Sequence, residues 1–209
     1  IKLEGVFESE QAFYLVFERL EGGTLLEYIN SKRGLSLEET KAVMRGLTEG
    51  LAYLHRFGIA HRDLKLENVL LRGGDRLQPV IADFGLAVLV EEEPYLFYRC
   101  GTPGYVAPEV IRMRQNKTAR VASDIFSAGV IFHVLLTNSY LFPGSNNQEV
   151  YRLNCEAKHD LSGDKYDKLD PDALDMLKKM LTVRADDRIT ADDMLDEPFL
   201  QEEDEESVD

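Results

Sequence analysis

The spacing of apolar residues divides the chain into a short strand-rich start and a long, mostly helical remainder. Residues 1–9 (IKLEGVFES) and 12–20 (AFYLVFERL) are rich in β-branched and aromatic side chains, and a short polar turn separates them. That combination predicts a β-hairpin. Residues 21–23 (EGG) break the pattern, and apolar residues recur mainly at helical spacing beyond them. The pattern therefore predicts an α+β organisation with a boundary near residues 21–23.

The longest predicted helix covers residues 36–58. Ser36 and Glu39 have the spacing of a capping box, and Gly58 ends the pattern. Its apolar face follows the i, i+3, i+4 rule through Val43, Leu47, Leu51 and Leu54. Shorter helices are predicted over residues 24–34, 123–137, 147–156, 171–181 and 190–200.

Between these helices the chain predicts a second pair of strands. Residues 68–72 (NVLLR) and 79–83 (PVIAD) are apolar runs on either side of a Gly-Gly-Asp turn. Residues 86–106 contain Gly and Pro and have no helical period, so a long loop is expected there. Residues 201–209 are an acidic run, which predicts a solvated tail.

Composition narrows the class of partner. Of 209 residues, 44% are hydrophobic and 30% are charged, which is ordinary for a globular protein. The formal net charge of −14 makes nucleic acid a poor partner, because no basic stripe is present to displace counterions. An acidic surface favours a cationic partner such as a basic peptide.

Cysteine usage and hydropathy predict a cytoplasmic protein. Cys100 and Cys155 are too few for a disulfide framework and fit a reducing compartment. The opening residues 1–10 are charged and alternating, unlike a secretory leader. The most apolar stretch, residues 127–136, is too short to span a bilayer, so a buried core helix is expected there and no membrane association.

Candidate chemistry is concentrated in residues 60–84. Two aspartates, a lysine and an asparagine fall on two short loops that a strand–turn–strand unit joins. Groups of this kind are suited to a metal-bound phosphate. The motifs involved are HRDLKLEN at 61–68 and DFG at 83–85. GTPGYVAPE at 101–109, SDIFSAG at 123–129 and Arg188 follow them in order.

In this order the motifs resemble those of eukaryotic protein kinases of the Ser/Thr type, most of all the calcium/calmodulin-dependent group. The resemblance covers nearly the whole chain. It implies a protein kinase-like fold in which residues 1–20 are the last strands of the small lobe and the hinge. Residues 21–200 would form the large lobe, and residues 201–209 the acidic tail.

The resemblance implies that ATP and Mg²⁺ are the cofactors, and it gives the catalytic residues individual roles. Asp63 would accept or orient the substrate hydroxyl proton, and Lys65 would contact the γ-phosphate. Thr102 would bridge these two side chains. Asn68 and Asp83 would provide hard oxygen ligands for Mg²⁺. Any one of them alone would be interpreted as a solvated loop residue, whereas the ordered set favours phosphoryl transfer.

Other matching positions are structural or regulatory. His61 and Phe84 resemble a stacked pair of the hydrophobic spine, and both are also expected in the core. Asp124 begins an apolar helix, where a buried charge needs hydrogen bonds; the resemblance makes the catalytic-loop backbone its partner. Glu109 and Arg188 resemble a buried ion pair that ties the activation segment to the helical lobe.

Residues 16–20 (VFERL) resemble the hinge that contacts adenine. Phe17 would be the gatekeeper, although a core strand residue would look the same. The backbone of Glu18 and Leu20 would meet the base edge, and Leu70 would close the pocket from below.

Substrate and switching residues are also suggested by position. Lys65 stands where Ser/Thr kinases carry lysine. Glu67 and Glu27 fall where basophilic relatives recognise arginine, although Thr24 replaces another glutamate common there. No Ser or Thr occurs at residues 86–99.

Tyr98 falls at the usual activating phosphosite. Glu91, Glu92 and Glu93 would either supply fixed carboxylates to Arg62 or form a solvated charge run.

No G-x-G-x-x-G or strand lysine in a Val-Ala-Ile-Lys context occurs among the 209 residues, so this chain alone is expected to be inactive. The first interpretation is a piece of a longer Ser/Thr protein kinase. The second is a truncated kinase-like scaffold or binding module without catalysis. The third, a small-molecule phosphotransferase, is disfavoured by residues 101–109, which resemble a peptide-positioning segment.

Overall fold

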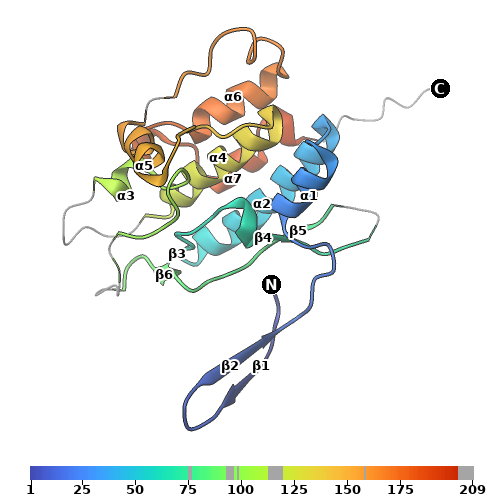
Figure 1. Cartoon of the computed structure of the whole chain (residues 1–209), viewed down its shortest axis with the longest axis vertical. Coiled ribbons are helices and arrows are strands. Elements are labelled where there is room, and N and C mark those ends of the chain that lie inside the picture. Colours follow the sequence, from blue (N-terminus) through green and yellow to red (C-terminus); the bar gives the residue numbers. More distant parts are fainter. Residues whose placement is uncertain (75–76, 93–96, 98, 113–119, 158, 202–209) are drawn as a thin grey trace.

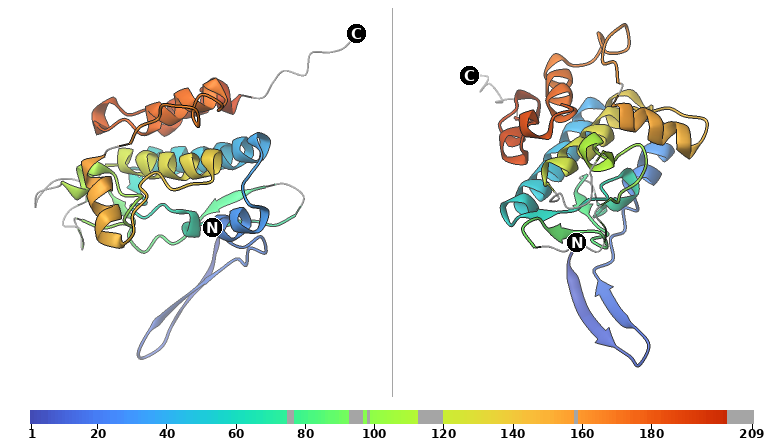
Figure 2. Two further views of the ribbon diagram at one scale, coloured as in Figure 1. Left: turned by 45° about the horizontal axis from the view of Figure 1, so that its top comes forward. Right: turned by 90° about the vertical axis from the view of Figure 1, so that its left-hand side faces the viewer.

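The amino-terminal hairpin is confirmed and extends from the body as an arm (Figure 1). The computed structural model describes the whole chain except residues 75–76, 93–96, 98, 113–119, 158 and 202–209. β1 (Leu3–Glu8) pairs antiparallel with β2 (Phe13–Phe17), with Glu8 opposite Phe13 across the turn. Figure 2 shows the same arm directed away from the helices in two further views.

Two capped helices follow the hairpin. Thr24 begins α1 (Leu25–Lys32) and Ser36 begins α2 (Leu37–Arg56), each with a complete capping box. The reciprocal hydrogen bonds satisfy backbone donors that the first turn of a helix leaves free. The four residues predicted for the apolar face of α2 are all buried. The capping box and the periodicity predicted for this helix are therefore confirmed.

Short antiparallel ladders hold the loops of the body. β4 (Val69–Leu71) pairs with β5 (Pro79–Ile81), as predicted. The prediction of one long loop over residues 86–106 is wrong in one place, because β6 (Val88–Leu89) pairs with β3 (Ile59–Ala60). Two-residue strands are too short to show a periodic pattern in sequence.

The remaining elements are helical. α4 (Ala122–Thr137), α5 (Asn147–Glu156) and α6 (Pro171–Met180) lie where helices were predicted. The helix predicted over 190–200 is shorter, because α7 (Ala191–Leu195) ends before Pro198, whose ring disfavours helical geometry at the preceding residue. Short turns complete the described elements: η1 (Leu66–Asn68), α3 (Pro108–Ile111), η2 (Ala185–Asp187) and η3 (Pro198–Leu200).

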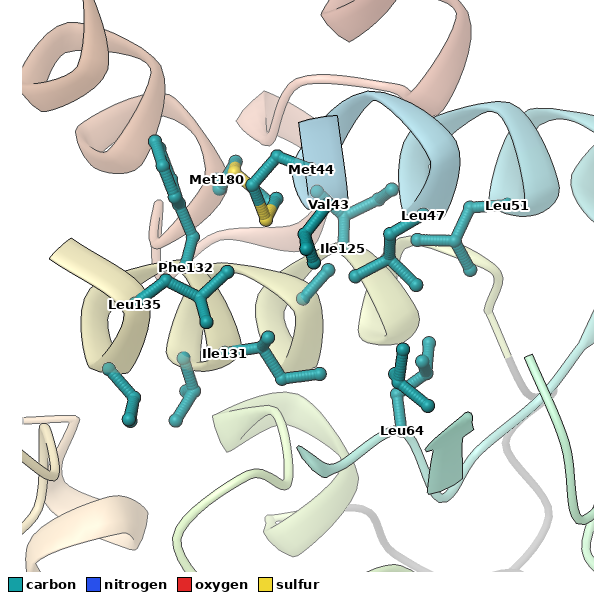
Figure 3. Close-up of a cluster of buried hydrophobic side chains, with 14 of the residues drawn as sticks. Val43, Met44, Leu47, Leu51, Leu64, Ile125, Ile131, Phe132, Leu135 and Met180 are labelled. Atoms are coloured by element: carbon teal, nitrogen blue, oxygen red, sulfur yellow. The ribbon is translucent and has the colours of Figure 1, made fainter. Parts of the chain in front are cut away.

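The core is built around α4. Residues 123–135 are all buried, as expected for a core helix. Helices α2 and α6 pack against α4, and α7 packs against α2. Figure 3 shows Phe132 and Ile125 of α4 beside Met44 of α2 and Met180 of α6. The α+β organisation, with a mostly helical body, is confirmed. In the described ranges, no helix is long and apolar enough to cross a bilayer.

Candidate active site

Three side chains predicted to carry catalysis meet in one hydrogen-bonded cluster. Thr102 Oγ1 donates to Asp63 Oδ1 over 2.7 Å, and Lys65 Nζ donates to Asp63 Oδ2 over 3.0 Å. Lys65 Nζ also lies 3.2 Å from Thr102 Oγ1. All three side chains are half-buried, so the Asp63 carboxylate is fixed in orientation and still reachable from one side.

Asp124 holds the backbone that carries Asp63. It is fully buried at the start of α4, where its two carboxylate oxygens accept the N–H of His61 over 2.8 Å and of Arg62 over 2.9 Å. Both bonds involve a charged acceptor, which strengthens them in a dry environment. The ring Nε2 of His55, at the end of α2, lies 3.2 Å from Asp124 Oδ2. Sequence reasoning missed His55, whose only signal was its place in the last turn of a predicted helix.

Asn68 and Asp83 emerge at the same end of the β4–β5 ladder. The Ala82 N–H donates to the Asn68 carbonyl over 2.9 Å, directly beyond the last paired residues. The Asn68 amide nitrogen donates to the Asp63 carbonyl and to Asp63 Oδ2, over 2.8 and 3.2 Å. This orientation leaves the Asn68 amide oxygen as an acceptor.

These two residues fit a magnesium site. Asp83 Oδ1 accepts the Gly85 N–H over 3.3 Å, and Asp83 Oδ2 has no partner within the described part of the chain. The pair thus offers hard oxygen donors beside Asp63, of the kind that Mg²⁺ prefers. No cluster of three or more His, Cys, Asp or Glu side chains suited to a metal is found in the described ranges.

Arg62 and Asp83 both have positive backbone φ angles, of 70° and 61°. This conformation is uncommon for residues with a side chain, and it tends to occur at functional sites. The Arg62 guanidinium donates to the backbone carbonyl of Phe97 in the activation segment. Burial raises the pKa of the nearby Cys100 thiol, and Arg62 opposes that shift.

The acidic run at residues 91–93 is only partly described. Glu91 and Glu92 are exposed, and neither forms an ion pair with another described residue. Glu93 and Tyr98 lie outside the described residues. The Arg62 guanidinium donates to the carbonyl of Phe97, and its pairing with the acidic run stays a prediction.

The His61–Phe84 pair is present, but the expectation that both residues belong to the core is wrong. Their rings meet edge to face with centroids 5.0 Å apart. His61 is fully buried and its Nε2 lies 2.9 Å from the Ala82 carbonyl, whereas Phe84 is 39% exposed.

Glu109 and Arg188 form a two-pronged ion pair. The guanidinium donates to the two carboxylate oxygens over 2.7 and 3.0 Å, and its side chain is fully buried. It also lies over the ring of Phe126, 5.2 Å from the ring centroid. The pair connects the segment after residue 100 to the carboxyl-terminal part of the chain. The Arg188 guanidinium also donates to the carbonyl of Ala122, at the start of α4.

The residues expected to contact adenine lie where the hairpin meets the body. Leu70 is half-buried in β4, and an isolated β-bridge joins it to Thr24. Leu20 is also half-buried. Phe17 is 43% exposed, so the interpretation as a core strand residue is wrong for this chain. The Glu18 carboxylate accepts two hydrogen bonds from Arg72, a residue that sequence reasoning missed because it ends an ordinary strand.

The two glutamates expected to bind a substrate arginine differ. Glu27 Oε2 is committed to the α1 cap, where it accepts the Thr24 N–H over 2.9 Å. Glu67 is exposed and lies near Tyr105. The pKa of Tyr105 is raised by burial and, to a smaller extent, by the Glu67 charge.

A pocket of about 360 Å³ lies between the segment after residue 102 and the α4–α5 connection. Its walls are mostly apolar and include Tyr105, Tyr140, Phe142 and Val150. Pro103, Gly104 and Tyr105 in its wall directly follow Thr102 in the chain. The pocket therefore borders the segment that carries Thr102.

Comparison with known proteins gives consistent relatives. The protein kinase domain family matches residues 1–200. The chain is 33% identical over 204 residues to a probable myosin light chain kinase of Dictyostelium discoideum, covering 97% of this chain and 65% of that protein.

Two further relatives come from animals. The liver/testis isoform of the human phosphorylase b kinase gamma catalytic chain is 34% identical over 96% of this chain and 50% of its own length. A serine/threonine-protein kinase H1 homolog of Pinctada fucata is 36% identical over 96% of this chain and 48% of its own length. The chain thus spans about half to two thirds of the curated relatives that it matches.

Proposed function

The chain belongs to the protein kinase family, and on that premise we propose that it forms the hinge and large lobe of an ATP-dependent serine/threonine protein kinase. The observation that carries the proposal is the cluster of Asp63, Lys65 and Thr102, held in place by Asp124. Phosphoryl transfer requires mainly positioning and charge stabilisation, and this cluster supplies both.

The residues divide the work as follows. ATP with Mg²⁺ supplies the transferable phosphoryl group when bound. Asp63 accepts a hydrogen bond from the hydroxyl of a substrate Ser or Thr and takes up its proton. Lys65 places a positive charge next to Asp63, on the side where phosphate charge develops. Thr102 fixes both side chains, so neither has to reorient during the reaction.

Asn68 and Asp83 would hold the metal, since their carbonyl and carboxylate oxygens extend from the same end of the β4–β5 ladder. The backbone of Glu18 and Leu20 would contact adenine, with Phe17 and Leu70 on either side of the base. Without a strand lysine and a glycine-rich loop, the 209 residues alone would give negligible phosphorylation.

The decisive experiment compares Asp63→Asn with wild type in the full-length protein. Phosphorylation of a Ser peptide should fall at least about 100-fold, because the proton acceptor is lost. The dissociation constant for ATP should stay within about twofold, since Asp63 contacts the acceptor side. Asp192→Asn, an exposed carboxylate on α7, is the matched control and should behave as wild type.

Three outcomes would contradict the proposal. Full activity in Asp63→Asn would remove Asp63 from the mechanism. A wild-type full-length protein that transfers no phosphate to any peptide would support a kinase-like scaffold, and transfer only to small molecules would support the third interpretation.

We also propose a basic protein substrate and a cytoplasmic location. Glu67 is exposed beside the catalytic cluster and the chain carries a net charge of −14, both of which favour an arginine-containing peptide. The free thiols of Cys100 and Cys155 fit a reducing compartment. A peptide library should show basic residues enriched before the phosphosite, and Glu67→Gln should reduce that enrichment. A library without basic enrichment would contradict the substrate proposal.

A further inference from the structure

The Glu18 carboxylate joins three separate segments of the chain. Arg72 donates to it through both terminal nitrogens, Nη1 to Oε2 over 2.8 Å and Nη2 to Oε1 over 3.2 Å. The backbone N–H of Lys2 donates to the same Oε1 over 2.9 Å. Glu18 directly follows β2, Arg72 directly follows β4, and Lys2 precedes β1.

This contact is more restricted than most surface ion pairs. The Glu18 side chain is only 18% exposed although it lies near the surface. A guanidinium that binds both oxygens of a carboxylate fixes distance and also orientation, which a single lysine bond does not. The Arg72 side chain is 47% exposed, and an ion pair with an exposed partner usually adds little stability. The expected role of this pair is therefore geometric.

The segment after Glu18 is fastened to the same part of the body at its other end. The Gly22 N–H donates to the Leu71 carbonyl over 3.0 Å, and the Leu71 N–H donates to the Gly23 carbonyl over 2.9 Å. The backbones are so close that a Cβ on Gly22 would lie 2.6 Å from Leu71. Residues 18–23 are thus attached at both ends to residues 71–72.

Within residues 1–209, this attachment and one hydrogen bond from the first residue link the hairpin to the body. All five residues of β2 are exposed, and Figures 1 and 2 show the arm projecting beyond the body. Packing by β2 therefore does little to fix its direction. The amino-terminal ammonium also reaches the Ile81 carbonyl, over 3.2 Å, but that is a single hydrogen bond at a chain end.

We propose that Arg72 is a positioning residue for nucleotide binding. Its two hydrogen bonds to the Glu18 carboxylate fix the position of the backbone of residues 18–20. The inference rests on the proposed function, in which this backbone faces adenine. Holding the segment in its binding conformation before the nucleotide arrives reduces the ordering cost of binding. Arg72 would then act on nucleotide affinity without touching the nucleotide or the reacting atoms.

The test uses the full-length protein and two independent measurements on Arg72→Ala. Hydrogen exchange without nucleotide should be faster at the amides of Glu18, Gly22 and Leu71. The dissociation constant for Mg²⁺–ATP should rise about three- to tenfold, with kcat nearly unchanged. In Arg72→Lys, the exchange rates and the dissociation constant should lie between those of Arg72→Ala and wild type. A lysine keeps the positive charge but cannot bind both carboxylate oxygens as a guanidinium does.

A double-mutant cycle and a matched control isolate the pair. Glu18→Ala combined with Arg72→Ala should weaken nucleotide binding no further than Arg72→Ala does alone. Arg56→Ala removes another exposed arginine that binds a carboxylate, Asp192, on the far helices. It should leave both the exchange rates and the dissociation constant at wild-type values.

The outcomes separate this inference from the function on which it rests. Wild-type exchange rates in Arg72→Ala would overturn it, and so would additive losses in the double mutant. Faster exchange with unchanged ATP affinity would overturn the positioning role. A wild-type protein that binds no ATP would overturn the proposed function and the nucleotide role of Arg72 together. The exchange data, collected without nucleotide, would still report whether Arg72 holds the hinge.

Discussion

The helix α4 and the β1–β2 hairpin are both rich in apolar residues and have opposite surroundings. Residues 123–135 of α4 are buried all round, whereas every residue of β2 and all of β1 except Gly5 are exposed. Phe132 of α4 has no exposed surface, and Phe13 of β2 is 71% exposed. Apolar composition thus identifies surface that favours burial, and the neighbouring elements decide how much of it is buried.

The two regions should therefore be stabilised by different interactions. The helical body gains free energy mostly from removing apolar side chains from water. In the described chain the hairpin is held by its own backbone ladder and by the contacts of residues 18–23. A substitution in the body should affect global unfolding, and the equivalent substitution in the hairpin should affect local opening only.

The largest expected effect is that of Phe132→Ala. The ring packs against Phe199 with centroids 5.2 Å apart and is fully buried, so its loss should leave a cavity. The free energy of unfolding should fall by about 3–5 kcal/mol. Urea denaturation of the variant and of wild type measures the difference. A fall in the free energy of unfolding as small as that expected for the exposed Phe13 in Phe13→Ala would show that burial does not distinguish the body from the hairpin.

A second effect is an acid sensitivity that arises from buried histidines of the body. Burial, with a further contribution from Lys165, lowers the pKa of His133 to about 4, and its Nε2 lies 3.0 Å from the Tyr166 hydroxyl. Burial also lowers the pKa of His159. All four histidines lie outside the hairpin.

The sign of this effect follows from the lowered pKa. The folded state binds fewer protons than the unfolded state between the ordinary histidine pKa of 6.5 and about 4. The contribution of His133 to the free energy of unfolding should therefore be fully present above pH 6.5. It should fall by up to about 1.4 kcal/mol per pH unit as the pH drops toward 4. Denaturation at several pH values measures the slope. His133→Phe should flatten it, and an unchanged slope would contradict the assignment.

A smaller effect is expected from the caps. Ser36→Ala removes the hydroxyl that accepts the Glu39 N–H over 3.1 Å and should cost about 1 kcal/mol of global stability. Ser9 is the matched position in the hairpin turn, where its hydroxyl accepts the Ala12 N–H over 3.2 Å. Ser9→Ala should leave the urea midpoint unchanged, because the turn can open while the body stays folded. Equal shifts would show that the two regions unfold as one unit.

The smallest effect is that of Phe13→Ala. The side chain is exposed, and its loss should change the free energy of unfolding by about 0.5 kcal/mol or less. The same denaturation measurement applies, with Phe132→Ala as its counterpart. A loss of several kcal/mol would mean that the hairpin contributes to the global core.

Sequence was a good guide wherever a local signal was strong. The capping box of Ser36 and Glu39, the period of α2 and the burial of α4 all follow from local pattern. The β3–β6 ladder could not be predicted, because pairing of two-residue strands depends on tertiary position. The early end of α7 was present in the sequence as Pro198 and was missed.

The candidate site divides in the same way. Asp63, Lys65, Asn68 and Asp83 could be chosen from ordered motifs. The structure joins the first three by hydrogen bonds, and Asp83 follows Ala82, whose N–H donates to the Asn68 carbonyl. The exposure of Phe17 and Phe84 could not be foreseen, because it depends on what covers each ring. Arg72 and His55 had no motif, and only their distances to Glu18 and Asp124 reveal them.

The way in which Asp124 holds the catalytic loop also affects how the loop can evolve. It binds the backbone N–H groups of residues 61 and 62, so the anchor does not depend on which side chains stand there. The side chain at position 62 can therefore change while Asp63 keeps its position; glycine, which tolerates positive φ, would be among the least disruptive replacements. Asp124 itself cannot be replaced in the same way. In an asparagine, the side-chain NH2 group would face one of the two backbone N–H groups that the carboxylate accepts. The anchor therefore tolerates a change of side chain at position 62 and does not tolerate one at position 124.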